Sequence, residues 1–326
     1  MKRTFLKFAL AAQAVSMLSF AAPVAAAEAY PSKPIRMMLG YPAGSGIDSV
    51  ARLVAGRMEK TLGQQVYIDN KPGALSNIAA MAVATAEPDG YTILFTPNSA
   101  PVANVHLFKK LPFDPVKDFT PISPVATLGF VVLVNPAKTK ANSLAELTAM
   151  LKKNPGKYSY GTGNATGQVA GALYTHLAGV DALDVPYKGV PPAIIDLIGG
   201  RTDFVMADAS LAIPQVAGGR VKALAVTSAE RIPALPDVPT MTEAGLPDYD
   251  LWGWFGIFMP AKAPVEITRL LEKSVKETMA DPAVVASLRK IGVTPWLGTS
   301  DDLAKAVVTD TVKWGKIIKR AGIQAQ

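Results

Sequence analysis

The sequence predicts an α/β fold of two lobes, each a mostly parallel sheet flanked by helices. Short apolar runs alternate with amphipathic stretches along the chain, as in proteins whose parallel strands are joined by helices. Two Pro-rich extended stretches, 113–124 and 235–254, interrupt this alternation and predict crossings between the lobes. We therefore expect one lobe from residues 28–125 plus 253–326, and a second lobe from the inserted residues 126–252.

The first 27 residues have the pattern of a cleavable secretory leader. A basic start with three Lys or Arg residues precedes an uncharged apolar run, 8–22, and three small residues, 25–27. The apolar run is shorter than the ~20 residues that span a membrane. We expect the exported chain to start near Glu28, which leaves enough residues for two lobes.

The expected secondary structure follows the apolar periodicity and the Gly and Pro punctuation. Strands are predicted at 35–39, 66–69, 92–96, 130–134, 158–161, 182–185, 204–207, 223–227 and 254–259. Helices are predicted at 49–62, 77–86, 144–153, 169–178, 191–199, 213–218, 265–280, 282–291 and 300–321. Ser143 and Ser300 are the expected N-caps of two of these helices.

Composition excludes several classes of function. The net charge of +7 falls to 7 − 3 = +4 without the leader, and the Lys pairs have no interleaved aromatic residues, so nucleic acid is not an expected partner. The chain has no Cys and two isolated His residues, which excludes disulfides, thiolate nucleophiles and Cys-ligated metals. We find no Gly-x-Ser-x-Gly elbow and no metal-ligand spacing, so we expect no catalytic residues, no metal and no cofactor.

The first candidate binding segment is the turn between the first predicted strand and helix. Backbone N–H groups at a helix start are unpaired, and the helix dipole favours an anion there. The alternative is an ordinary strand-to-helix turn in which the acidic residue only complements the dipole. The candidate residues of this turn are Tyr41, Ala43, Gly44, Ser45, Gly46 and Asp48.

Other small polar segments follow predicted strands or precede predicted helices, in both lobes. Each has a structural alternative, since Ser, Asn, Thr and Asp also cap helices and form turns. The candidates of the first lobe are Ala74, Leu75, Ser76, Asn77, Thr96 and Asn98. Those of the second lobe are Thr162, Gly163, Asn164, Ala165, Thr166, Tyr187 and Asp208.

Ten short segments, in order and with consistent spacing, give the chain a family resemblance over essentially its whole exported length. They are 31–36, 42–48, 70–74, 86–92, 160–162, 185–189, 196–200, 224–227, 235–240 and 243–245. On these segments the chain resembles the periplasmic solute-binding receptors of tripartite tricarboxylate transporters, the Bug or TctC-type proteins.

The resemblance implies a two-lobed Venus-flytrap, the periplasmic-binding-protein architecture, that closes on a small carboxylated solute. It implies a periplasmic location, delivery of the solute to membrane permease subunits, a monomer, and neither catalysis nor a cofactor. One alternative is a ligand sensor that presents its closed form to a sensor kinase. A periplasmic hydrolase is a third class, disfavoured by the absence of a candidate nucleophile and base.

This chain departs from the family pattern at its first two candidate loops. Ser45 and Ile47 stand where Gly and Thr are common, and Leu75-Ser76 stands where Gly-Gly is usual. If they face the cleft, Ile47 and Leu75 add apolar surface to it and favour a ligand with a hydrophobic or aromatic body; the alternative is that they only pack against the helices. The departures argue against a simple citrate-type specificity.

Overall fold

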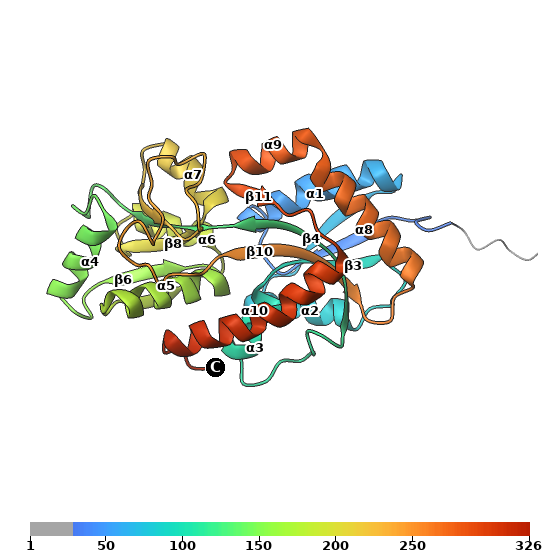
Figure 1. Ribbon diagram of the computed structural model, residues 1–326, viewed down its shortest axis with the longest axis horizontal. Helices are drawn as coiled ribbons and strands as arrows, with labels where there is room; N and C mark the ends of the chain where they lie inside the picture. Colours follow the sequence, from blue (N-terminus) through green and yellow to red (C-terminus); the bar gives the residue numbers. More distant parts are fainter. Residues whose placement is uncertain (1–28) are drawn as a thin grey trace, which may run out of the picture.

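The computed structural model describes residues 29–326, which form two α/β lobes placed end to end along the long axis of the molecule (Figure 1). The predicted leader, residues 1–27, lies outside the described residues. Among residues 29–326, no helix is both long and apolar enough to cross a membrane.

Within the described residues, lobe 1 is built on a six-stranded sheet with the order β11-β4-β10-β3-β1-β2. Helices cover both faces of this sheet, and α1 packs against α8 and β2. The strands are β1 (Ile35–Leu39), β2 (Val66–Asn70), β3 (Thr92–Pro97), β4 (Phe119–Leu128), β10 (Gly253–Pro260) and β11 (Val293–Pro295). The helices are α1 (Gly46–Leu62), η1 (Ala74–Ser76), α2 (Asn77–Ala84), η2 (Ser99–Ala103), α3 (Asn104–Leu107), α8 (Val265–Ala280), α9 (Pro282–Lys290) and α10 (Ser300–Arg320).

Lobe 2, within the same residues, is built on a five-stranded sheet with the order β7-β6-β8-β5-β9. Its strands are β5 (Phe130–Val134), β6 (Ser159–Thr162), β7 (Leu183–Pro186), β8 (Phe204–Asp208) and β9 (Lys222–Val226). Its helices are α4 (Leu144–Lys153), α5 (Ala165–Ala178), α6 (Val190–Ile198) and α7 (Ala209–Ala217). The two-lobed α/β architecture predicted from the sequence is confirmed.

Both sheets are mixed, and not mostly parallel as predicted from the sequence. β1 pairs in parallel with β2 and β3, whereas β10 runs antiparallel to β3 and β4. In lobe 2, β6 pairs in parallel with β7 and β8, whereas β5 runs antiparallel to β8 and β9. The antiparallel pairs arise where the chain crosses between the lobes: β4 continues through Gly129 into β5, and β10 carries the chain back (Figure 1).

The sequence analysis missed β4 because its Pro residues suggested an irregular connection. Pro121 and Pro124 of β4 stand opposite β10, next to two register shifts in that pairing. Such irregularities accommodate residues that lack an N–H donor. Ser300 is not an N-cap; Thr299 caps α10 instead and forms a capping box with Asp302. Ser143 caps α4 as predicted, and its hydroxyl accepts from the N–H of Glu146.

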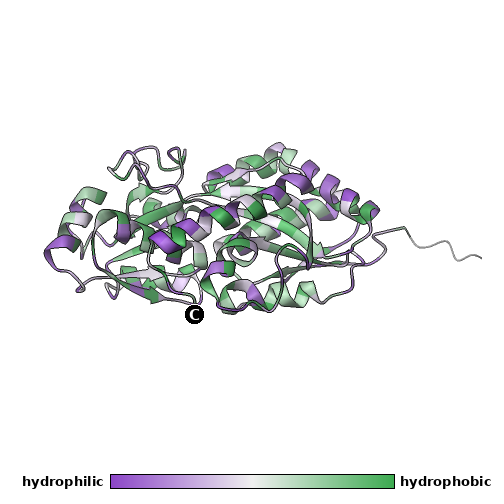
Figure 2. Ribbon diagram, turned by 60° about the horizontal axis from the view of Figure 1, so that its bottom comes forward, coloured by the Kyte–Doolittle hydropathy of each residue, from purple (hydrophilic) through white to green (hydrophobic). Residues whose placement is uncertain are grey.

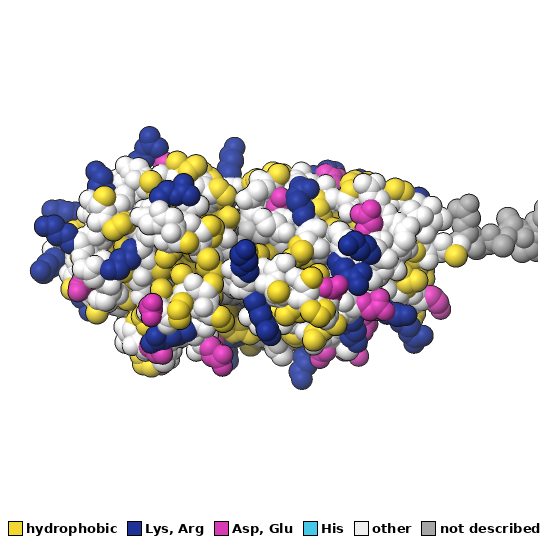
Figure 3. Space-filling view, turned by 90° about the horizontal axis from the view of Figure 1, so that it is seen from above, with side chains coloured by type: hydrophobic (Ala, Val, Ile, Leu, Met, Phe, Trp, Pro, Cys, Tyr) yellow, Lys and Arg dark blue, Asp and Glu magenta, His cyan; other side chains and the backbone are white. Residues whose placement is uncertain are grey.

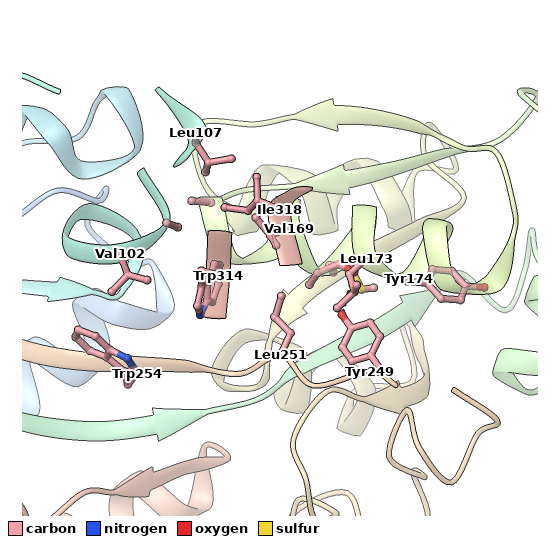
Figure 4. Packing of buried hydrophobic residues seen from close by; sticks show 14 of the residues in the cluster. Val102, Leu107, Val169, Leu173, Tyr174, Tyr249, Leu251, Trp254, Trp314 and Ile318 are labelled. Carbon is pink, nitrogen blue, oxygen red and sulfur yellow. Dashed lines mark hydrogen bonds between the residues drawn. The ribbon is translucent and has the colours of Figure 1, made fainter. Parts of the chain in front are cut away.

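The C-terminal helix α10 belongs to lobe 1 and also packs against lobe 2. Trp314 and Ile318 of α10 lie in one buried cluster with Val169 and Leu173 of α5, on one side of the crossing strands (Figure 4). The hydropathy colouring shows how the helices turn an apolar stripe inward and a polar stripe outward (Figure 2). The lobes are therefore joined by a continuous core as well as by two chain crossings.

Polar contacts connect α10 to the segment that leads back into lobe 1. The indole N–H of Trp254 donates to Asp310 at 2.7 Å. Lys313 and Arg320 pair with Asp250 and Asp248 at 2.8 and 3.1 Å. These contacts hold α10 against the returning segment at one edge of the lobe junction.

Candidate functional site: a cleft between the lobes

A narrow cleft lies between the two lobes, where four helices begin. The first turns of α1 from lobe 1 and of α5, α6 and α7 from lobe 2 all reach it. The cavity measures about 30 Å³. One water molecule needs ~10–15 Å³ on the same scale, so the cavity has room for about two. A larger ligand must move the lining side chains or the lobes apart. The sequence-predicted residues in the lining are Tyr41, Ser45, Gly46, Asn98, Gly163, Asn164, Thr166 and Asp208.

The turn between β1 and α1 provides the lobe 1 wall. The helix begins at Gly46, three residues before the predicted start, with Ser45 as its extended N-cap residue. The Ser45 hydroxyl donates to the Pro42 carbonyl at 2.7 Å and does not cap the helix. The N–H groups of the first turn of α1 thus face the cleft with the positive end of the helix dipole behind them.

Asp48 supports this turn from behind and does not line the cleft. Its carboxylate accepts from both Nε and Nη2 of Arg52, from the N–H of Gly44 at 2.9 Å, and from Asn70 at 3.0 Å. Burial alone would raise the pKa of Asp48, but these hydrogen bonds outweigh it and hold the pKa below its usual value. Gly44, with a left-handed φ of 80°, and Ala43 complete the turn outside the lining.

The second candidate loop of lobe 1 lies away from the cleft lining. Ala74, Leu75 and Ser76 all have positive φ, and Ser76 packs so closely on Gly40 that a side chain at position 40 would overlap it. Asn77 accepts from the amide of Asn104, which also donates to the Leu75 carbonyl at 2.9 Å. Ser76 therefore packs behind the end of β1, whereas Leu75 and Asn77 are held by Asn104 of α3.

Asn98 presents the most specific polar feature of the cleft. Its side chain is fully buried at the end of β3, and Oδ1 accepts from the Thr166 hydroxyl of lobe 2 at 3.4 Å. Its Nδ2 has no hydrogen-bond partner in the part of the chain that the structure describes. A buried donor without an acceptor costs about 1–3 kcal/mol, so this amide favours an acceptor from a ligand. Thr96 is buried beside it, and its hydroxyl donates to the Pro97 carbonyl.

The loop between β6 and α5 forms the facing wall in lobe 2. Gly163 packs so closely on Gly189 and Val190 that any side chain at position 163 would overlap their backbone. Asn164 caps α5 by accepting from the N–H of Gly167 at 2.7 Å. Thr162 and Ala165 lie outside the lining, and the Thr162 hydroxyl donates to Asp184.

Asp208 brings a carboxyl group from lobe 2 to the first turn of α1. It is buried at the end of β8, and the Ser210 hydroxyl donates to Oδ1. Burial raises the pKa of Asp208 above its usual value, although the bond from Ser210 opposes this. Burial also raises the pKa of Tyr41, to about 12, and the Tyr41 hydroxyl donates to Ser99. Tyr187 lies outside the lining, and its hydroxyl donates to Asp196.

Nine further lining residues are absent from the predicted site. Most are apolar, and they lie in the first turn of α1, at the end of β3, on the crossing strands, or at the starts of α6 and α7. Ile47 has a sequence signal, because it departs from the family pattern. The other residues have no signal that distinguishes them from core residues. They are Ile47, Pro97, Leu128, Phe130, Gly189, Val190, Leu211, Gly253 and Phe255.

The charge of the site and of the surface limits its chemistry. Among the described residues that line the cleft, Asp208 and Tyr41 are titratable and none is Lys, Arg or His. Within residues 29–326, no group of three or more His, Asp or Glu is arranged to hold a metal ion. Lys and Arg side chains are spread along the face seen from above, with Asp and Glu among them (Figure 3).

Comparison with known proteins agrees with this arrangement. Residues 50–323 match the TctC family, described as the tripartite tricarboxylate transporter family receptor. The BugT protein of Bordetella pertussis is 33% identical over 313 residues, covering 94% of this chain and 95% of that protein.

Two solved structures of related proteins contain bound acids. The structure of Rpa4515 from R. palustris with adipate is 31% identical, with a TM-score of 0.88, and covers 91% of this chain and 100% of that one. The structure of MatC from Rhodopseudomonas palustris with malate is 30% identical, with a TM-score of 0.83, and covers 89% and 100%. From its sequence match, its two-lobed fold and its interlobe cleft, the chain belongs to the TctC family of tripartite tricarboxylate transporter receptors.

Proposed function

We propose that the protein is a periplasmic receptor that captures a small carboxylate-bearing solute between its lobes and delivers it to a tripartite tricarboxylate-type permease. The observation that carries this proposal is the unpaired Nδ2 of Asn98, fully buried in the cleft. The first turn of α1, which Ser45 does not cap, reaches the same cleft. Both features offer hydrogen-bond donors, and a carboxylate supplies the matching acceptors with a charge that suits the helix dipole.

The ligands of related structures support a carboxylate as the solute. The adipate of Rpa4515 and the malate of MatC are both small acids. Capture by closure requires that the ligand bind the closed form better than the open form, so that binding shifts the population. Groups from both lobes in one lining support capture of this kind.

The roles of individual residues are part of this proposal. The predicted residues that line the cleft would contact the ligand, whereas Asp48, Ser76, Asn77 and Thr162 would hold the contacting loops in place. The lobe limits 28–125 plus 253–326 and 126–252, and export by a cleavable leader, stay predictions.

Binding is tested by a thermal-shift screen followed by calorimetry on purified protein that has been unfolded and refolded to remove any bound ligand. The panel contains mono-, di- and tricarboxylates, acidic amino acids and aromatic acids. A ligand that binds only the folded state raises the melting temperature by mass action. Selective stabilisation by one class of acid is the expected result, and no stabilisation by any acid would overturn the proposal.

Delivery is tested in cells with the acid that calorimetry identifies. Deleting the gene should abolish uptake of that labelled acid at low concentration, and restoring the gene should restore it. Unchanged uptake with lost ligand-induced gene expression would instead favour the sensor function.

A further inference from the structure

We propose that the solute is a monocarboxylic acid with an apolar body, its carboxylate held by Asn98 and the first turn of α1 and its body lying against the apolar side chains of the cleft. This inference rests on the proposed function and narrows its ligand class. It follows from the hydrogen-bond donors that each lobe offers, from the apolar side chains of the lining, and from the lack of Lys, Arg and His among the described lining residues.

Lobe 1 offers the donors for one carboxylate. The first turn of α1 has no cap from the Ser45 side chain, and the amide of Asn98 is buried with its Nδ2 unpaired in the described part of the chain. The Thr166 hydroxyl donates to Oδ1 of Asn98 at 3.4 Å, an arrangement that leaves the N–H groups of the amide for the ligand.

The helix starts of lobe 2 offer few donors for a second carboxylate. Asn164 already accepts from the N–H of Gly167 in the first turn of α5. Two prolines, Pro191 and Pro192, follow the first residue of α6 and carry no N–H at all. α7 begins directly after Asp208, so its start already faces a carboxyl group of the protein itself.

The remaining wall of the cleft is apolar. A second ligand carboxylate would lie against these side chains, with no Lys, Arg or His among the described lining residues. Burying an unpaired carboxylate is strongly unfavourable, whereas burying a methyl or phenyl end is favourable by the hydrophobic effect. The apolar side chains are Ile47, Leu128 and Phe255 of lobe 1 and Phe130, Val190 and Leu211 of lobe 2.

Two matched pairs of acids test the inference by calorimetry on the refolded protein. Hexanoate and adipate both have six carbons, and adipate has a second carboxylate in place of the terminal methyl group. Benzoate and terephthalate share one ring, and terephthalate has a second carboxylate on it. We expect the monoacid to bind at least tenfold more tightly in at least one pair. Equal or tighter binding of the diacid in both pairs would overturn the inference but leave the proposed function standing. If no acid of the wider panel binds either, the proposed function itself fails.

A charge placed on the lobe 2 wall provides an independent test. Val190 is buried in the first turn of α6 and lines the cleft. Val190→Lys should shift the adipate-to-hexanoate affinity ratio at least tenfold toward adipate, relative to Val190→Met of similar length. A ratio that is the same in both variants would contradict the assignment of the distal ligand end to this wall.

Discussion

Gly46 of lobe 1 and Asp208 of lobe 2 meet across the cleft, so closely that a methyl group on Gly46 would overlap Oδ1 of Asp208 and the hydroxyl of Ser210. Gly46 is the first residue of α1, and its backbone does not itself require glycine. The absence of a side chain at this position is therefore what permits the lobes to approach.

Gly46→Ala should act as a wedge that keeps the lobes apart. The radius of gyration of the ligand-free protein, measured by small-angle X-ray scattering, should increase while the protein stays folded. Gly56→Ala is the matched control, since a methyl group there meets nothing within 4 Å and should stabilise α1 by about 0.5–1 kcal/mol. An unchanged radius in Gly46→Ala would contradict this wedge effect.

Asn98→Asp should abolish most of the affinity for the best-binding acid. The substitution keeps the shape of the side chain, replaces the free donor by an acceptor, and opposes a ligand carboxylate with like charge. Loss of a hydrogen bond to a charged group is worth about 1.5–3 kcal/mol, so calorimetry should show a loss of tenfold or more. Thr166→Val removes only the 3.4 Å bond to Oδ1 and should cost less. Equal affinities for wild type and Asn98→Asp would remove Asn98 from the site.

Asp208→Asn should stabilise the protein at neutral pH. Burial raises the folded-state pKa of Asp208 above its unfolded value of about 3.9. The favourable contribution of Asp208 to the free energy of unfolding is therefore fully present below pH ~4 and is lost as the pH rises through the folded pKa. The loss is about 1.4 kcal/mol for each pH unit between the unfolded and the folded pKa. The stability gain from Asp208→Asn, measured by urea unfolding, should grow from pH 4 to pH 7.

Asp48→Asn provides the control of opposite sign. Hydrogen bonds from Arg52, Gly44 and Asn70 lower the pKa of Asp48 despite its burial. The ionised carboxylate therefore stabilises the fold above pH ~4, and this stabilisation is lost as the pH falls through the lowered pKa. This variant should be less stable than wild type at pH 7. A gain for Asp208→Asn that does not vary with pH would contradict the titration account.

Ala74→Gly should be neutral or stabilising, although glycine usually weakens a structure. Ala74 is exposed with a φ of 46°, a left-handed conformation that costs a residue with a side chain ~1–2 kcal/mol. Ala145→Gly, at an exposed position of α4, should instead cost about 0.5–1 kcal/mol. The free energy of unfolding, measured with urea, should fall for Ala145→Gly and not for Ala74→Gly. Equal losses in the two variants would contradict the left-handed conformation of Ala74.

Local signals allowed the sequence to predict the strand-to-helix turns. The Gly and Pro residues between Leu39 and Asp48 break an apolar strand before an amphipathic helix, and three residues of this turn line the cleft as expected. Asn98 and Asp208 were identified for the same reason, since each follows a predicted strand closely.

Long-range packing explains what the sequence did not predict. Leu128, Phe130 and Phe255 lie on crossing strands, and whether such residues face the cleft or the core depends on a register set between segments far apart in the sequence. The left-handed backbone at Ala74–Ser76 also had no local signal, because none of these residues is glycine.

The most direct test is a crystal structure of the refolded protein with the acid that calorimetry shows to bind best. The account predicts one carboxylate oxygen within hydrogen-bond distance of Nδ2 of Asn98, the carboxylate at the first turn of α1, and the apolar end of the acid against Val190 and Leu211. An acid bound outside this cleft, or bound within it while Nδ2 of Asn98 stays unpaired, would contradict the account.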